Sequence, residues 1–321
     1  MQSSAKYLIL FILKLNESLK LCVDYKALNN IMIKNSYLLS LIAELQNKLQ
    51  SVQWFMKFDI FKAFNWIWIK EKDEWKTVFC TWLEHYEYLI MSFDLINASI
   101  TFQIFVNNVL QCYLNQFVIV YLNDILVYLK MKKEHMQYIK KVLQTLKKVD
   151  LHIKSEKSEF HVQSVQFLRF IVMSQNLRMN LKKIKAVMTW LMLKLKIEVQ
   201  FFLRFANFYR QFIEKYFRII LSLTNLMRKN ISFVWTEKAK EAFKKLKKLF
   251  IFQSVLIMFE SDKLIMLEMN ASDEVIEACI NQLNNKKCLH FIAFYNRKFT
   301  DAELNYKIHD KKLLTIVNSF K

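Results

Sequence analysis

The feature that most constrains this 321-residue chain is that it contains no glycine and no proline. Glycine takes positive φ without a steric penalty, and proline fixes φ in turns. Ordinary usage of roughly 7% Gly and 5% Pro predicts about twenty and about sixteen of them at this length. Tight turns and helix ends must therefore use Asn, Asp, Lys or Arg, at a cost of roughly 1 kcal/mol each. The sequence predicts a fold of marginal stability.

Two explanations of this absence are open. Designed helical bundles lack both residues, but this chain has dense aromatics, β-branched runs and no sustained heptad or 3.6-residue repeat. The second explanation lies in the coding DNA. Gly codons are GGN and Pro codons CCN, so conversion of G·C pairs to A·T removes both. The same pressure explains 7 Arg beside 41 Lys. We therefore favour a gene decayed by C-to-T and G-to-A change.

The net charge of +20 indicates a polyanionic partner, most often nucleic acid. Part of this charge has another source under the decay hypothesis, because G-to-A change converts Glu to Lys and Asp to Asn. No apolar run is long enough and free enough of charge to span a bilayer, so we expect no membrane association. Five scattered cysteines without a C-x-x-C pair predict no disulfide framework and no zinc site.

The pattern along the chain predicts an α+β protein. Residues 54–60 read as a buried strand that contains Asp59, residues 86–92 as another strand, and residues 100–114 as an amphipathic helix. Two apolar runs in residues 117–130 flank Asn123 and Asp124, which is typical of a β-hairpin with a carboxylate at its tip. We expect a basic helix at residues 131–149 and short strands at residues 152–179. A helical region is expected at 182–248, strands at 255–300 and a final helix at 301–321.

Several ordered motifs resemble the reverse transcriptase of gypsy-type (Metaviridae) LTR retrotransposons. They are LCVDYKALNN (21–30), KFDIFKAFNWIWIKEKDEWKTVF (57–79), HYEYLIMSFDLINASITFQ (85–103) and FVIVYLNDILVYLK (117–130). LEMNASDEVIEACINQL (267–283) and NRKFTDAELNYKIHDKKLLTIV (296–317) resemble the start of the attached ribonuclease H domain. The resemblance implies a right-hand polymerase followed by a truncated ribonuclease H-like α/β domain. It predicts fingers and an antiparallel palm sheet in 1–175, a helical thumb and connection in 176–250, and the ribonuclease H-like part in 251–321.

Departures from the family pattern run in one direction. YLDD of the family is YLND here, with Asn123 in place of Asp. MPFGL is Met-Ser-Phe-Asp-Leu at residues 91–95, TDAS carries Asn270 in place of Asp, and DKELL carries Lys312 in place of Glu. Each change is a single C-to-T or G-to-A step in a suitable codon. The motifs therefore support a mutationally decayed copy of the reverse transcriptase and ribonuclease H region of a Pol polyprotein.

The resemblance implies a two-Mg²⁺ nucleotidyl transfer site at Asp59, Asn123 and Asp124. Asp59 and Asp124 are the expected metal ligands, because Mg²⁺ prefers carboxylate oxygens. Asn123 offers a neutral amide, which is expected to weaken metal binding and to cost several kcal/mol of transition-state stabilisation. Taken alone, Asp59 would be interpreted as a polar residue that ends a strand.

The resemblance also implies contacts with nucleotide and template. These residues are Lys20, Lys26, Phe64, Asn97 and Gln103, of which Phe64 matches an aromatic gate against a ribose 2′-hydroxyl. In isolation Phe64 would be a core aromatic and the two lysines solvated charges. In the ribonuclease H-like part, Asn270 and Lys312 stand at positions where the family has metal-binding carboxylates. This part is expected to be inactive.

The leading interpretation is an RNA-directed DNA polymerase with a partial ribonuclease H domain, in a copy inactivated by YLND. The alternatives are a non-enzymatic nucleic-acid-binding remnant and a pseudogene product without function. By resemblance, the partners are an RNA/DNA primer–template, dNTPs and other Pol domains of a longer polyprotein. The sequence fixes no compartment, although the resemblance implies an intracellular retrotransposon particle.

Overall fold

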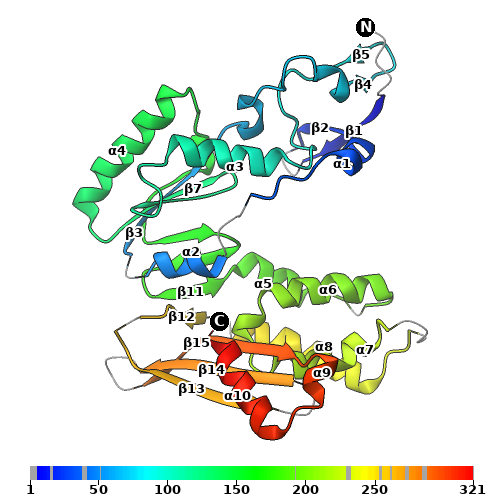
Figure 1. Ribbon diagram of the computed structural model, residues 1–321, viewed down its shortest axis with the longest axis vertical. Helices are drawn as coiled ribbons and strands as arrows, with labels where there is room; N and C mark the ends of the chain where they lie inside the picture. Colours follow the sequence, from blue (N-terminus) through cyan, green and yellow to red (C-terminus); the bar gives the residue numbers. More distant parts are fainter. Residues whose placement is uncertain are drawn as a thin grey trace. The chain divides into compact units, whose positions relative to one another are not determined.

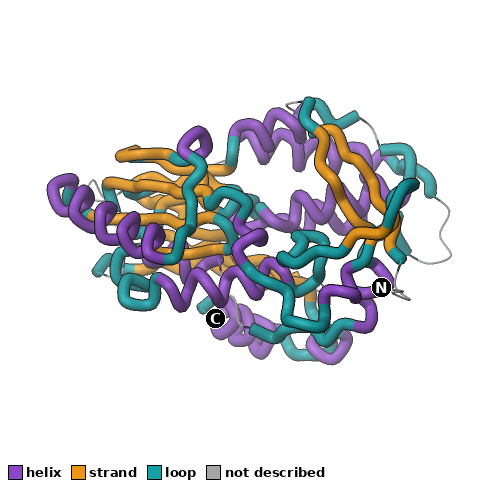
Figure 2. Tube along the Cα trace, turned by 90° about the horizontal axis from the view of Figure 1, so that it is seen from above, coloured by secondary structure: helices purple, strands orange, loops and turns teal. Residues whose placement is uncertain are grey.

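The computed structural model describes residues 6–14, 17–37, 42–50, 52–191, 193–228, 233–252, 255–260, 262–271, 275–283 and 288–320. The chain forms two compact units (Figure 1). Residues 1–48 and 52–165 form the first, and residues 49–51 and 166–321 form the second. Figure 2 shows that the chain contains both helices and strands, in agreement with the predicted α+β class.

The main sheet of the first unit has the strand order β6-β7-β3-β8. These strands are Val118–Tyr121, Asp124–Leu129, Trp54–Asp59 and Glu159–Val162. Helices α3 (Ala98–Val109) and α4 (Lys132–Lys148) share one apolar core with this sheet. The predicted strand at 54–60, hairpin at 117–130 and helix at 131–149 are thereby confirmed. The inner strands carry buried apolar residues such as Phe58 and Ile125, which belong to this core.

A second sheet in this unit has the order β2-β1-β4-β5, and β1 runs parallel to β4. Its strands are Leu19–Val23, Tyr7–Leu13, Phe79–Cys80 and His85–Tyr86. The other short elements of the unit are α1 (Lys26–Ile31), α2 (Ile42–Lys48), η1 (Ala63–Trp66), η2 (Glu74–Thr77) and η3 (Ser155–Lys157).

The strand predicted at 86–92 is wrong beyond Tyr86. Ile90 makes only an isolated bridge with Trp68. The chain then turns, with the Leu95 amide donating to the Ser92 carbonyl at 3.3 Å. The backbone of this segment bonds to distant residues instead of a strand ladder, since the Met91 amide donates to the Ile67 carbonyl and the Tyr88 amide donates to the Thr77 hydroxyl. Its apolar alternation therefore does not produce a strand.

The second unit begins with a sheet of order β12-β11-β10-β9, and the boundary between the units falls within β9. These strands are Val255–Ile257, Asn176–Met179, Phe170–Met173 and Ser164–Phe167. The helices that follow are α5 (Leu181–Met188), α6 (Lys196–Phe208), η4 (Arg210–Phe212), α7 (Tyr216–Asn225) and α8 (Glu237–Phe252). This order agrees with the expected short strands followed by a helical region.

The last sheet is an antiparallel meander of β13 (Ile265–Ala271), β14 (Val275–Leu283) and β15 (Leu289–Lys298). Helix α9 (Asp301–Leu304) and helix α10 (Ile308–Ser319) follow, and α10 packs against β13 and β14. The short helix η4 and helix α7 both contact β15. The predicted strands of 255–300 and the final helix are confirmed.

The lack of glycine has a consequence for the backbone dihedral angles. In the described ranges, ten non-glycine residues have φ between 45° and 72°. Six are of the expected types Asn, Asp, Lys and Arg, and the other four are Glu17, Leu122, His161 and Leu168. This left-handed conformation costs a residue with a Cβ atom roughly 1–2 kcal/mol, whereas glycine adopts it without that penalty. The expectation of strained turns is therefore met, with more varied residues than the sequence suggested.

The five cysteines, all within the described ranges, form no disulfide with one another. Among the described helices, none is both long and apolar enough to cross a membrane.

Candidate active site

The hairpin of β6 and β7 brings the candidate catalytic residues together. Tyr121 pairs with Asp124, so Leu122 and Asn123 form the turn. On the other side of β7, Asp124 is the direct partner of Asp59 at the end of β3. The Ile60 amide reaches the Asn123 carbonyl at 3.5 Å. Asp59, Asn123 and Asp124, predicted from separate motifs, therefore meet at one end of the sheet.

Both carboxylates have basic neighbours. Lys57 Nζ lies 3.0 Å from Asp124 Oδ2, and Lys157 Nζ lies 3.7 Å from Asp59 Oδ2. The Asp124 side chain is 35% exposed and that of Asp59 27%. Burial raises the pKa of Asp124, the charge of Asp59 raises it further, and Lys57 and Lys157 oppose the rise. Two like-charged carboxylates thus share a half-buried position, which costs energy unless cations neutralise them.

The amide of Asn123 is incompletely satisfied, because its Oδ1 atom is buried and has no hydrogen-bond partner. The backbone of Asn123 contacts Ile60, the residue that follows Asp59, and oxygen donors are the ligands that hard divalent cations prefer. Among the residues that the structure describes, no cluster of three or more His, Cys, Asp or Glu could hold a metal. The donors that remain therefore fit Mg²⁺ in kind, while their charge is lower than three aspartates would supply.

Four residues predicted to contact nucleotide or template lie in the first unit outside the hairpin. Lys20 Nζ lies 3.3 Å from the centroid of the Phe93 ring, whereas Lys26 is exposed at the start of α1. Phe64 packs edge-on against buried Phe102 with ring centroids 5.9 Å apart. Asn97 holds the backbone of residues 33–35, since it donates to the Ile33 carbonyl and accepts from the Asn35 amide. Their roles toward a substrate stay predictions.

The fifth of these residues, Gln103, is only 2% exposed and points to the turn of the hairpin. Its Oε1 accepts from the Leu122 amide at 2.5 Å, and its Nε2 donates to the Val120 carbonyl at 3.2 Å. Gln103 therefore contacts the backbone that carries Asn123, and burial separates it from solvent.

Sequence reasoning missed the two lysines that pair with the carboxylates. Lys57 precedes Asp59 by two residues on β3, so the period of a strand places both on one face. That alternation could have indicated the contact with Asp124. Lys157 offers no comparable signal, because it reaches Asp59 from the separate segment η3.

The ribonuclease H-like positions belong to the second unit. Asn270 pairs with Glu277 in the β13–β14 ladder and lines a pocket of about 200 Å³. Lys312 is exposed on α10 and is not among the residues that line this pocket. The structure therefore does not bring the two positions together in this pocket.

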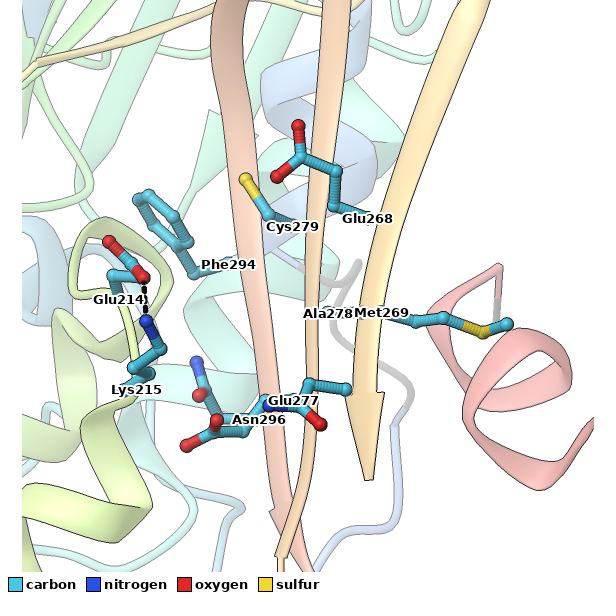
Figure 3. Close-up of a pocket in the computed structure, with 10 residues that line it drawn as sticks. Glu214, Lys215, Glu268, Met269, Glu277, Ala278, Cys279, Phe294 and Asn296 are labelled. Carbon is cyan, nitrogen blue, oxygen red and sulfur yellow. Dashed lines mark ion pairs between the residues drawn. The ribbon is translucent and has the colours of Figure 1, made fainter. Parts of the chain in front are cut away.

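Several acidic residues line the pocket (Figure 3). Two of its buried oxygen atoms have no hydrogen-bond partner. Its lining includes Glu214, Glu268 and Glu277, with Lys215 paired to Glu214 at 2.6 Å. Glu277 and Asn296 are partners across β14 and β15, and Glu277 Oε1 and Asn296 Oδ1 are buried without hydrogen-bond partners. Burial raises the pKa of Glu277, although Arg218 and Lys215 lower it. Like Asn123 at the hairpin, Glu277 and Asn296 thus have buried oxygen acceptors without hydrogen-bond partners.

Two family models match the chain. The model described as reverse transcriptase (RNA-dependent DNA polymerase) matches residues 12–172. The model described as an RNase H-like domain found in reverse transcriptase matches residues 235–321. The first range contains all the candidate polymerase residues, and the second contains Asn270 and Lys312.

Curated relatives include the transposon Tf2-3 and Tf2-4 polyproteins of Schizosaccharomyces pombe (strain 972 / ATCC 24843). Each is 33% identical over 313 residues, which cover 98% of this chain and 24% of the relative. The chain thus spans about a quarter of the length of these polyproteins.

Solved structures with the same fold include two of foamy virus. One is the foamy viral protease-reverse transcriptase in complex with RNA/DNA hybrid, with a TM-score of 0.83 and 19% identity, covering 100% of this chain and 43% of that chain. The other is the foamy viral protease-reverse transcriptase dRH in complex with ds DNA, with a TM-score of 0.87 and 19% identity, covering 100% of this chain and 56% of that chain. These likenesses support the right-hand polymerase fold followed by a ribonuclease H-like domain.

The polymerase family match extends over half of the chain, and the hairpin with Asp59 and Asp124 lies within it. The chain belongs to the reverse transcriptase (RNA-dependent DNA polymerase) family.

Proposed function

We propose that this chain is the reverse transcriptase and ribonuclease H region of a gypsy-type LTR retrotransposon Pol polyprotein, in a decayed copy whose polymerase is inactive. The observation that carries the proposal is the register that sets Asp59 opposite Asp124, with Asn123 in the adjoining turn. The lack of Gly and Pro supports decay, since the same base changes that remove them convert Asp to Asn.

Asp59 and Asp124 would hold Mg²⁺, and the buried Oδ1 of Asn123 would face it as a neutral donor. When bound, Mg²⁺ supplies activation of a primer hydroxyl and neutralisation of phosphate charge. The chain itself must supply the anionic cradle, and one of its three positions carries no charge. Lys57 and Lys157 form ion pairs with the two carboxylates and would compete with a metal cation for them. Weak metal binding follows from both facts.

By this proposal residues 1–175 form fingers and palm, 176–250 the thumb and connection, and 251–321 the ribonuclease H-like part. The substrates are an RNA or DNA template with a primer, and dNTPs. The complexes of the foamy viral proteins with RNA/DNA hybrid and double-stranded DNA support this class of partner. Asn270 and Lys312 leave the ribonuclease H-like part without two carboxylates, so we propose that it is inactive as well.

A primer-extension assay tests the proposal. The Asn123→Asp variant, with an RNA template, a DNA primer, dNTPs and Mg²⁺, is expected to synthesise DNA. The same variant carrying Asp124→Asn is the matched control and is expected to be inert. Failure of Asn123→Asp to extend any primer, in a protein that folds and binds the duplex, would refute the proposal of a polymerase inactivated at this position.

A nucleic-acid-binding remnant is the second candidate, favoured by the net charge of +20. It predicts primer–template binding that weakens steeply with salt, without extension by either variant. If neither variant yields folded protein, a pseudogene product without function is the remaining interpretation.

A further inference from the structure

In a two-residue hairpin turn, the amide of the first turn residue takes no part in the strand ladder. Tyr121 and Asp124 close the ladder here, so this residue is Leu122. Leu122 has φ of 54°, in the left-handed region that costs a leucine roughly 1–2 kcal/mol. A strained residue persists only where its surroundings hold it. Another part of the protein must therefore fix this turn.

Gln103 on α3 supplies that support. Its Oε1 accepts from the Leu122 amide, and its Nε2 donates to the Val120 carbonyl just before the turn. The second Nε2 proton goes to Asn107 Oδ1 at 2.8 Å. These three bonds allow only one orientation of the amide, because a flipped group would set donor against donor at Leu122. At 2% exposure the group has no water to replace a lost partner.

The chain of hydrogen bonds continues to the surface of the unit. Asn107 Nδ2 donates to the hydroxyl of Tyr37 at 2.8 Å, and Tyr37 is 39% exposed. Asn107 thus fixes the donor end of Gln103 from one side, while α3 packs into the same core as β6 and β7. The hydrogen bonds link a helix, the turn and an exposed tyrosine.

We propose that Gln103 is a positioning residue of the polymerase site, which holds the Leu122–Asn123 turn so that position 123 lies beside Asp59 and Asp124. This role rests on the proposed polymerase function, and it differs from direct contact with template or nucleotide. A group that sets the geometry of catalytic ligands affects the rate of chemistry, whereas a group that touches substrate also affects its binding.

Hydrogen exchange of the full chain tests the geometry without any activity. In Gln103→Met, exchange of the turn segment 117–129 is expected to be about tenfold faster, the equivalent of one lost buried hydrogen bond. Val106→Ala is the matched control, since Val106 is fully buried on the same helix and its apolar side chain cannot form a hydrogen bond with the turn. It is expected to leave exchange at the turn unchanged. Asn107→Ala, which keeps the Leu122 bond, is expected to accelerate exchange by only about two- to threefold.

Kinetics in the Asn123→Asp background separates positioning from substrate contact. Gln103→Met is expected to lower kcat about tenfold with KM for dNTP and primer–template unchanged. Unchanged exchange at the turn, or a rise in KM with kcat preserved, would overturn the positioning role. If Asn123→Asp is inactive, the proposed function fails, while the exchange experiment still decides whether Gln103 holds the turn. If Gln103→Met does not fold, Asn107→Ala carries the test.

Discussion

On the proposed decay, the hairpin site of the first unit and the ribonuclease H-like positions of the second unit have lost carboxylates in different ways. At the hairpin, one of three positions is neutral, and the register of β3 and β7 still sets Asp59 against Asp124. In the second unit, Asn270 lines a pocket that Lys312 does not share, and buried Glu277 stands there with an unpaired oxygen. A site held by strand register keeps its geometry when one side chain changes, and a single reversal can restore its charge. Two losses on separate elements cannot be repaired in this way.

The largest expected effect removes a surviving carboxylate of the hairpin. In the Asn123→Asp background, Asp59→Asn is expected to lower the rate of primer extension about 1000-fold or more, because it removes charge from the metal cradle. Glu268→Gln in the second unit, measured in the same background, is expected to leave extension unchanged. Equal losses in both variants would abolish the distinction between the two regions.

A substitution in the pocket is expected to change the free energy of unfolding of the protein. Glu277→Gln should raise the free energy of unfolding by about 1 kcal/mol near pH 8, because it removes the charge of a buried carboxylate whose Oε1 has no hydrogen-bond partner. The raised pKa of Glu277 means that its contribution is most favourable below the unfolded pKa and is lost as pH rises through the folded pKa. The gain should therefore shrink toward about pH 4. Urea unfolding of both proteins at the two pH values measures this, and an equal gain at both would exclude the charge as its cause.

The strained backbone of the first unit gives a smaller effect. Helix α4 ends in a Schellman pattern, since the amides of Asp150 and Leu151 donate to the carbonyls of Lys147 and Leu146. Asp150 has φ of 57° at the position where glycine is preferred. Asp150→Gly should raise the free energy of unfolding by about 0.5–1 kcal/mol, as measured by urea titration. A lower free energy of unfolding for Asp150→Gly would mean that glycine is not preferred over Asp at this helix end.

No effect at all is expected from Asn270→Asp on cleavage of the RNA strand of an RNA/DNA hybrid. One restored carboxylate leaves Lys312 in place, and an ammonium group opposes a divalent cation. The assay is release of labelled RNA fragments with Mg²⁺ or Mn²⁺. Cleavage by Asn270→Asp alone would show that the second unit, like the first, is one substitution away from activity.

Much of the fold follows from patterns in the sequence. The alternation around Asn123 and Asp124 predicts the hairpin, and buried apolar runs predict β3 and β7. The strand predicted at 86–92 is wrong because the backbone of this segment bonds to Ile67, Ile69 and the Thr77 hydroxyl, which periodicity does not reveal. Left-handed φ at Leu122 and Leu168 is equally hidden, because leucine does not favour it.

The candidate site is predictable in its residues and less so in its contacts. Asp59 and Asp124 are separated by many residues, and only the resemblance to a family joins them before the strand register is known. The pairing of Lys157 with Asp59 and the burial of Gln103 depend on packing between elements. Sequence spacing carries no such information for residues on different elements.

The central claim is that one lost carboxylate at an otherwise assembled site silences this polymerase. The most direct test compares primer extension by the unmodified chain and by Asn123→Asp, on one RNA template at one Mg²⁺ concentration. We predict that Asn123→Asp is faster by about 100-fold or more, because a negative charge returns to the metal cradle. Robust extension by the unmodified chain, at a rate equal to that of the variant, would contradict the claim.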